Sequence, residues 1–315
     1  MKPNQPMTRR DSLKKLLHMS GAAALTAFSG WPLSGPKPVW AKDEKKKFLI
    51  EGLGQTEGYA VKALTEKVFE AAGGITRFIS RGDVVVIKPN ISWARGPNLA
   101  ATTNPEVLES VIALCYNAGA KKVRIADHTI NDARRCFAIT GAGAVAKKTN
   151  ADLIFPRSTL MKRMKIRGHR LDVWPVFVPL VEADKVINLP VAKDHVLSTL
   201  TLGMKNWIGA VGGRRSALHQ DIHQTIVDLA QFFKPTVTLI DATKIMTKNG
   251  PSGGSISDVA VKNTLILSND PVAADALAAR LFDRRPEQIG FIRLAQKRNL
   301  GTYDLEQLDQ KKVVL

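Results

Sequence analysis

The chain has 315 residues, of which 44% are hydrophobic and 23% are charged, an ordinary globular composition that suffices for one large α/β domain or two small ones. No stretch beyond the N-terminus carries about 18 consecutive apolar residues, so we expect no transmembrane helix in the mature protein. The formal net charge of +18 favours anionic partners. An aromatic content of 6% gives little material for stacking on bases, so nucleic acid is not expected as a partner.

The first 41 residues resemble a twin-arginine export signal rather than part of the fold. Arg9 and Arg10 precede a weakly apolar run, and the stretch PVWA provides a small-residue cleavage site before Lys42. The alternative, a membrane-anchoring helix, is disfavoured because glycines and a proline interrupt the run. We therefore expect a periplasmic or otherwise exported protein that uses the twin-arginine export machinery. A solvated linker over 42–47 and a single α/β domain over 48–315 would follow.

The cysteine content limits the cofactors. The two cysteines, Cys115 and Cys136, are too few and too widely spaced for an iron–sulfur cluster or a four-cysteine zinc site, so no iron–sulfur cluster is expected. An exported protein could join them in a disulfide, but the sequence does not fix their separation, and a buried thiol at Cys115 is the alternative.

Past the linker, short apolar runs alternate with helical patterns. The residues predict strands over 83–90, 121–128, 151–156, 183–191, 235–242 and 264–270, and helices over 102–120, 132–150, 223–234 and 271–282. Thr103 and Glu106 have capping-box spacing at the start of the first helix. Residues 164–179 suggest a hairpin instead. This order predicts an α/β fold with a mostly parallel sheet, helices on both faces, and a small antiparallel insertion in the middle.

Polar residues follow the predicted strands at the edge where open parallel sheets bind ligands. Lys88 and Asn90 come at the end of one strand, His195 follows another, and Asp241 ends a third. Helix capping could account for one or two of these residues. It does not account for Lys88, because a lysine suits the C-terminus of a helix rather than its N-terminus.

The stretch LHQDIHQTIVDLAQFF (218–233) places His219, Asp221 and His223 at alternating positions. If a helix begins near His219, the two histidines share one face; if it begins at Asp221, that residue is the N-cap. Three interpretations stay open: a divalent metal site made by these three residues, an acid–base or supporting role for a histidine, and simple capping. Metal binding would need a further ligand, such as His195, Asp241 or Asp127.

Glycine-rich segments provide a second group of candidates. In GMKNWIGAVGGRR (203–215), Gly212 and Gly213 would let the backbone approach an anion, and Lys205 would supply charge. Arg214 and Arg215 could reach the same anion or face water. The turn NGPSGG (249–254) adds Gly253 as a ligand-binding candidate, with an ordinary surface loop as the alternative.

In chain order, the stretches VVVIKPN, IADH, LGMKNWIGAVGG, HQDIHQTIVDLA, TLIDA, NGPSGG and SNDPVAADALAARL resemble the domain of unknown function family 362. The resemblance spans roughly 83–282 and implies an α/β domain without supplying a reaction. Many members carry a ferredoxin-like cysteine cluster that this chain lacks, so iron–sulfur chemistry does not transfer. The site residues that the resemblance implies are Lys88, Asn90, Lys205, Asn206, His219, Asp221, His223 and Asp241.

We therefore expect an exported protein that binds an anionic small molecule, or a metal–anion pair, at the rim of the sheet. Lys88 and Lys205 would hold negative charge. His219 or His223 would transfer a proton or bind metal, and Asp241 would orient the histidine or share the ion. Without residues 1–41 the chain keeps 40 basic and 27 acidic residues, a net charge of +13. The alternatives are accordingly a non-catalytic envelope protein that docks on anionic membrane or wall polymers, and a metal or cofactor carrier.

Overall fold

The computed structural model describes residues 47–55 and 58–315, so the predicted export signal and nearly all of the predicted linker lie outside the described residues. The described strands are β1 (Phe48–Leu53), β2 (Val84–Pro89), β3 (Lys122–Ala126), β4 (Asp152–Ile154), β5 (Met161–Lys165), β6 (Val173–Phe177), β7 (Lys185–Leu189), β8 (Val191–His195), β9 (Thr199–Thr201), β10 (Val237–Met246), β11 (Val259–Ser268) and β12 (Asp309–Val314). The described α-helices are α2 (Val61–Ala71), α3 (Pro105–Asn117), α4 (Ala133–Ile139), α5 (Ala142–Thr149), α6 (Pro179–Glu182), α7 (Ile222–Phe233), α8 (Pro271–Arg280) and α9 (Gly290–Lys297).

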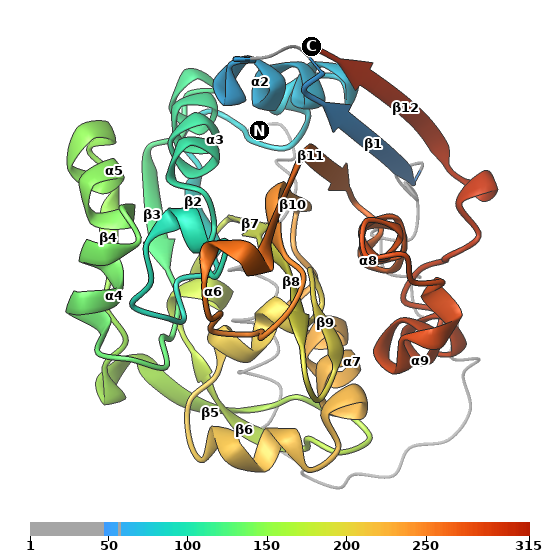
Figure 1. Ribbon diagram of the computed structural model, residues 1–315. Helices are drawn as coiled ribbons and strands as arrows, with labels where there is room; N and C mark the ends of the chain where they lie inside the picture. Colours follow the sequence, from blue (N-terminus) through green and yellow to red (C-terminus); the bar gives the residue numbers. More distant parts are fainter. Residues whose placement is uncertain (1–46, 56–57) are drawn as a thin grey trace, which may run out of the picture.

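One large sheet organises the described part of the chain (Figure 1). Its strand order is β12-β1-β11-β10-β7-β2-β3-β4, and β8 pairs with β10 and carries β9. The neighbours from β10 to β4 are all parallel, whereas β11 is antiparallel to both β10 and β1. Strands β5 and β6 form a separate antiparallel ribbon. The predicted fold class, a mostly parallel sheet with a small antiparallel insertion, is confirmed.

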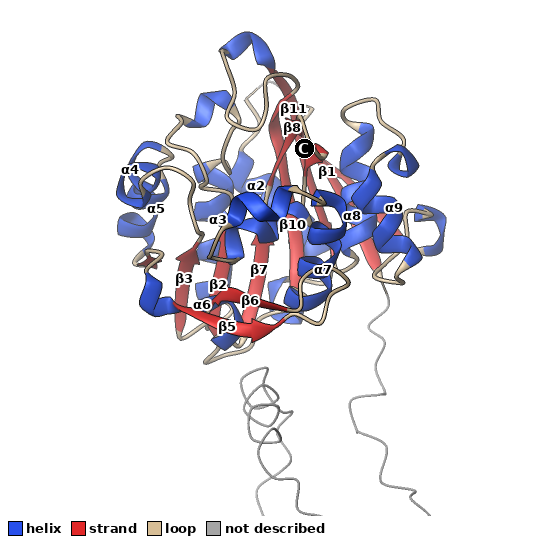
Figure 2. Cartoon of the chain, turned by 90° about the horizontal axis from the view of Figure 1, so that it is seen from below, coloured by secondary structure: helices blue, strands red, loops and turns tan. Residues whose placement is uncertain are grey.

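Helices cover both faces of the sheet. Figure 2 looks onto one face, with strands β3, β2, β7 and β10 side by side. Side chains alternate along a strand, so neighbouring residues enter opposite cores. Val86 and Ile240 pack in the core that contains α7, α8 and α9. Val85 and Leu239 pack in the core that contains α2, α3 and α5. Burial on both faces explains why residues 84–87 of β2 are all apolar instead of alternating with polar residues.

The start of α3 differs from the predicted capping box. Asn104 is the N-cap, and its Oδ1 accepts from the backbone N–H of Glu106 (2.9 Å). Pro105 is preorganised for the first helical position, which makes the residue before it the cap. The Thr103 hydroxyl instead donates to the carbonyl of Leu189 (2.8 Å), so this side chain ties the entry of α3 to the end of β7.

The helix predicted over 132–150 is two helices, because Gly141 adopts a left-handed conformation (φ 81°) between α4 and α5.

Cys115 and Cys136 are both buried and free, so the disulfide interpretation is wrong. In residues 47–55 and 58–315, no helix has the length and apolar character needed to span a membrane.

Candidate functional site

A cavity of about 80 Å³ lies beside the end of β2 and along β8; we call it the basic pocket. Its basic side chains come from β8 and from two 3-10 turns, Lys205–Ala210 and Arg215–His219. Four predicted site residues, Asn90, Lys205, Asn206 and His219, meet here. The full lining is Asn90, Ser92, Trp93, Ile130, Lys193, His195, Thr201, Lys205, Asn206, Ile208, Gly209, Arg215, His219 and Pro251.

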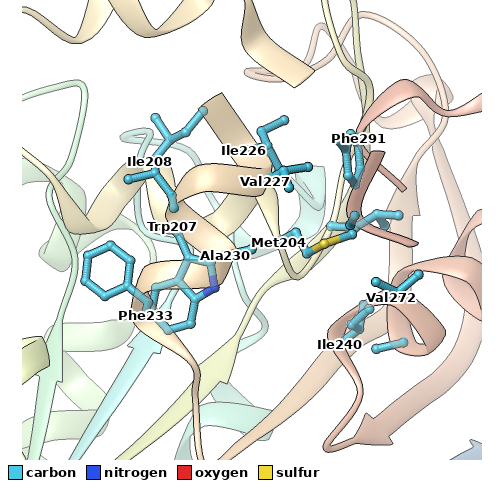
Figure 3. Packing of buried hydrophobic residues seen from close by; sticks show 14 of the residues in the cluster. Met204, Trp207, Ile208, Ile226, Val227, Ala230, Phe233, Ile240, Val272 and Phe291 are labelled. Carbon is cyan, nitrogen blue, oxygen red and sulfur yellow. The ribbon is translucent and has the colours of Figure 1, made fainter. Parts of the chain in front are cut away.

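The packed core holds the turn Lys205–Ala210 in place. Trp207 is 1% exposed, and its ring stacks on Phe233 of α7 with centroids 4.8 Å apart (Figure 3). The carboxylate of Asp275, on α8, accepts hydrogen bonds from the backbone N–H groups of Gly203 (2.7 Å) and Met204 (3.0 Å), which precede Lys205. Burial raises the pKa of Asp275 to about 7. Contacts from two helices therefore fix the backbone from which Lys205 enters the pocket.

Two buried lysines enter the pocket with unused donors. Lys205 is 8% exposed, and its Nζ has no hydrogen-bond or ion-pair partner within residues 47–55 and 58–315. Lys193 is 1% exposed and donates to the carbonyl of Ala101, which leaves further ammonium hydrogens for a ligand. Burial lowers the pKa of Lys205 to about 7. Burial and the charge of Lys205 lower the pKa of Lys193 well below that of an ordinary lysine.

Arg215 and Thr201 add more donors. The guanidinium of Arg215 donates to the carbonyls of His128 (2.6 Å) and Thr129 (2.7 Å), which holds it rigidly and leaves other N–H groups unused. Thr201 is 3% exposed, and its hydroxyl has no partner in the described part of the chain. No Asp or Glu occurs among the described lining residues. The pocket therefore presents surplus donors and positive charge that no lining carboxylate balances.

Two histidines line the pocket, and their hydrogen bonds to the backbone give them opposite tautomers. Their rings lie 6.4 Å apart between centroids and are nearly parallel, at 11°. The Nδ1 of His195 accepts from the backbone N–H of Leu197 (3.1 Å), so in the neutral ring Nε2 carries the proton. The Nδ1 of His219 lies 3.2 Å from the carbonyl of Arg215, which can only accept, so the Nε2 of neutral His219 is an acceptor. Burial, with the nearby charge of Lys205, lowers the pKa of His195 to about 3 and also lowers the pKa of His219.

Lys88 lies beneath the basic pocket and is not among its lining residues. Its Nζ donates to Asp127 Oδ1 (2.6 Å), Asn206 Oδ1 (3.0 Å) and the carbonyl of Pro89 (2.8 Å), which uses its ammonium hydrogens. Lys88 therefore orients Asn206 and neutralises Asp127, a different role from the predicted anion contact. A Cβ on Gly209 would lie 2.1 Å from Asp127 Oδ1, so the turn above this ion pair requires glycine.

The comparisons with known proteins identify the family. The family model described as Domain of unknown function (DUF362) matches residues 85–280. The chain belongs to the DUF362 family. Every residue of the basic pocket, from Asn90 to Pro251, lies within the DUF362 match.

This DUF362 chain is also similar to a curated protein and to a solved structure. A thylakoid-associated protein of Synechocystis sp. is 26% identical over 241 residues, covering 74% of this chain and 73% of that protein. The solved structure of the lactate racemase apoprotein from Thermoanaerobacterium thermosaccharolyticum has a TM-score of 0.45 and 13% identity. Its match covers 74% of this chain and 56% of that chain.

The predicted metal ligands of this DUF362 chain do not come together. Helix α7 begins at Ile222, and Asp221 is its N-cap, accepting from the backbone N–H of Gln224 (3.3 Å). His219 therefore lies in the preceding turn, and the His223 ring lies 6.3 Å from that of Phe291 on α9. No group of three His, Cys, Asp or Glu side chains in the described ranges is placed to hold a metal ion. The ligand set His219, Asp221 and His223 is thus not assembled, because the helix start separates its members.

Asp241 also lies outside the lining of the basic pocket. Its carboxylate accepts from the backbone N–H of Asn104 (2.7 Å) and from both the N–H (3.0 Å) and the hydroxyl (2.7 Å) of Thr243. Burial raises the pKa of Asp241, and these hydrogen bonds oppose that rise. The carboxylate joins β10 to the start of α3, so it does not orient a histidine.

The predicted glycines Gly212, Gly213 and Gly253 do not line the basic pocket. Gly212 and Gly213 line a separate groove of about 430 Å³ beside the β5–β6 ribbon, together with His128. A Cβ on Gly212 would lie 3.0 Å from the sulfur of Met161, so glycine makes room for the ribbon. The carbonyl of Gly253 accepts from Arg95 (3.1 Å), and Gly253 lines neither cavity.

Sequence reasoning missed Lys193 and Thr201. It placed His195 at the edge of the sheet where ligands bind but gave it no role beyond that of an additional metal ligand. The alternation of side chains along β8 puts Lys193 and His195 on one face, a signal present in the stretch VAKDH. Thr201 gave no such signal, because a threonine in a strand is ordinary and the missing partner of its hydroxyl is visible only in three dimensions.

Proposed function

We propose that the basic pocket binds a small anion, such as a carboxylate or a phosphate, as ligand or substrate. The observation that carries this proposal is the convergence of Lys193, Lys205 and Arg215 on one cavity without a lining carboxylate in the described residues. Burying such charges unpaired costs several kcal/mol, and a bound anion would supply the missing partner. The unpartnered hydroxyl of Thr201 supports the same conclusion, since an anion would accept its hydrogen bond.

The size of the basic pocket limits the ligand. A cavity of about 80 Å³ holds roughly three water molecules, at about 30 Å³ for each. An ion such as phosphate, oxalate or glyoxylate is of this size. A larger molecule would have to place only its anionic end inside.

The histidines give the bound anion an acid–base pair. Neutral His219 presents an acceptor at Nε2, and neutral His195 presents a donor at Nε2. Because burial lowers the pKa of His219, the base form is present at neutral pH. We infer that His219 accepts a proton from a bound substrate while the Nε2–H of His195 stabilises charge on a substrate oxygen.

Titration calorimetry of the purified chain with phosphate, sulfate, oxalate and glyoxylate at low ionic strength tests anion binding. We expect one equivalent to bind, with affinity at least about tenfold weaker in Lys205→Met and Lys193→Met, since each variant removes a charge-assisted hydrogen bond of about 1.5–3 kcal/mol. Lys244→Met, at an exposed position of β10, is the matched control and should bind as the wild type does. The proposal fails if none of the four anions binds, or if folded Lys205→Met and Lys193→Met bind them normally.

We also propose export by the twin-arginine route, which the sequence motif around Arg9 and Arg10 supports. The Synechocystis relative is named for its thylakoid association, and peripheral contact of this chain with an anionic membrane or wall polymer is part of the same proposal. Replacing both arginines by lysine should leave the protein in the cytoplasm. Diffuse surface binding should weaken steeply as ionic strength rises, whereas a pocket variant such as Lys205→Met should leave it unchanged.

A further inference from the structure

The amine of Lys205 has the environment of a nucleophile as well as that of a charge partner. It is buried, it has no acceptor within residues 47–55 and 58–315, and it shares its cavity with the amine of Lys193 and the guanidinium of Arg215. An ammonium in such surroundings loses its proton readily, and a neutral lysine amine adds to carbonyl groups. Lys193, by contrast, uses one donor on the carbonyl of Ala101, which restrains its Nζ.

We propose that Lys205 forms an imine with the carbonyl carbon of a small 2-oxo carboxylate whose carboxylate is held by Lys193 and Arg215. This inference rests on the proposed anion binding and names the class of substrate. The carboxylate satisfies the fixed donors of the pocket, and the adjacent carbonyl then lies beside the remaining amine. The pKa of Lys205, lowered by burial to about 7, keeps about half of the amine neutral near pH 7.

The covalent step needs no oxidant, reductant or co-reactant. The lone pair of Lys205 Nζ attacks the carbonyl carbon, a C–N bond forms, and the π electrons of the carbonyl move to its oxygen. His219 Nε2 takes a proton from the nitrogen and returns it to the oxygen, giving a neutral carbinolamine. The hydroxyl then takes up a proton from solvent and leaves as water while the nitrogen lone pair closes the C=N bond. The resulting iminium nitrogen gives one proton back to solvent, so no net proton is consumed. Amine and carbonyl thus yield imine and water.

The two histidines suit this sequence of proton transfers. During the attack, the Nε2–H of His195 can donate to the oxygen as its negative charge develops. The base at His219 and the donor at His195 face the same cavity, and their stacked rings are 6.4 Å apart. Both proton positions follow from hydrogen bonds to the backbone, so the roles are set before a ligand arrives.

Trapping with borohydride tests the imine directly. The purified full chain is incubated with glyoxylate, reduced with sodium borohydride, and analysed by intact and peptide mass spectrometry. We expect one reduced adduct at Lys205, formed at least tenfold faster than at exposed Lys244. Acetaldehyde lacks the carboxylate and should show no preference for Lys205. Glycolate lacks the carbonyl and should give no adduct. Excess oxalate should suppress labelling by glyoxylate.

Three variants separate the amine from its charge. Lys205→Arg keeps a cation and should retain oxalate binding while losing the adduct. Lys205→Met should lose the adduct even if the arginine variant does not fold. Lys193→Met should still label at Lys205, at higher glyoxylate concentration. An adduct at Lys193, or equal labelling of exposed lysines, overturns the assignment. Normal oxalate binding without any adduct refutes the imine alone, whereas absence of both refutes the anion site as well.

Discussion

Replacing Lys205 by methionine tests the electrostatics of the basic pocket without a ligand. Methionine keeps an unbranched apolar side chain but has no ammonium group. Lys205 is 8% exposed, its ammonium has no partner among the described residues, and burial lowers its pKa from 10.5 to about 7. The charged form is therefore less favourable in the folded protein than in the unfolded chain.

The size of the effect on stability follows from the pKa values of Lys205 in the unfolded chain, 10.5, and in the folded protein, about 7. Between about pH 7 and pH 10.5 the unfolded chain holds a proton on Lys205 that the folded protein has lost, so stability rises with pH across this window. The interval of about 3.5 pH units, at about 1.36 kcal/mol for each unit, corresponds to about 5 kcal/mol. This destabilisation is fully present below about pH 7 and disappears as the pH approaches 10.5.

Urea denaturation at about pH 6, 7, 8 and 9, in buffers without multivalent anions, measures the effect. We expect Lys205→Met to be more stable than the wild type at about pH 6, and this advantage to shrink by about 1.4 kcal/mol for each pH unit above 7. Lys244→Met, at an exposed site, should differ from the wild type by less than about 0.5 kcal/mol throughout. A difference between Lys205→Met and wild type that is the same at both ends of the range would refute the buried charge.

Three further predictions concern the pocket and its support. Affinity for oxalate should fall up to about tenfold per pH unit above 7, because Lys205 loses its charge; constant affinity measured by calorimetry would contradict this. Gly209→Ala should lower the free energy of unfolding by more than about 2 kcal/mol, since its Cβ would lie 2.1 Å from Asp127 Oδ1, and a wild-type urea midpoint would exclude the clash. Asp228→Asn should cost about 1–3 kcal/mol, because the carboxylate accepts from the backbone N–H of Leu171 (2.9 Å) and from Arg298 (2.6 Å). These hydrogen bonds lower the pKa of Asp228, so its contribution is present above about pH 4 and should be lost as the pH falls through the folded value.

The fold was predictable because burial leaves a clear pattern. The valine run of β2 is apolar at every position since both faces of the strand are covered, and the helices around it repeat their apolar residues at helical spacing. The predicted helix over 132–150 was less reliable, because whether Gly141 lies inside a helix or between two depends on tertiary packing.

The site was only partly predictable. Lys205 and His219 were found because they stand in motifs rich in glycine or histidine. Asp241 and Asp221 looked equally suitable, but a carboxylate that binds a ligand and one that caps a helix have the same sequence context; their hydrogen bonds distinguish them. Lys193 was missed because a lysine in a strand is usually solvated, and only the fold shows that this one is buried.

Arg215 belongs to the basic pocket, yet the carbonyls that hold it belong to the segment that carries His128, which lines the groove beside the β5–β6 ribbon. The backbone carbonyls of His128 and Thr129, which hold Arg215, thus form a wall shared by the two cavities. Any molecule that filled the larger cavity and displaced this wall would shift the guanidinium and alter affinity in the smaller one. Thermodynamic reciprocity then requires that occupancy of the smaller cavity alter affinity in the larger one by the same factor.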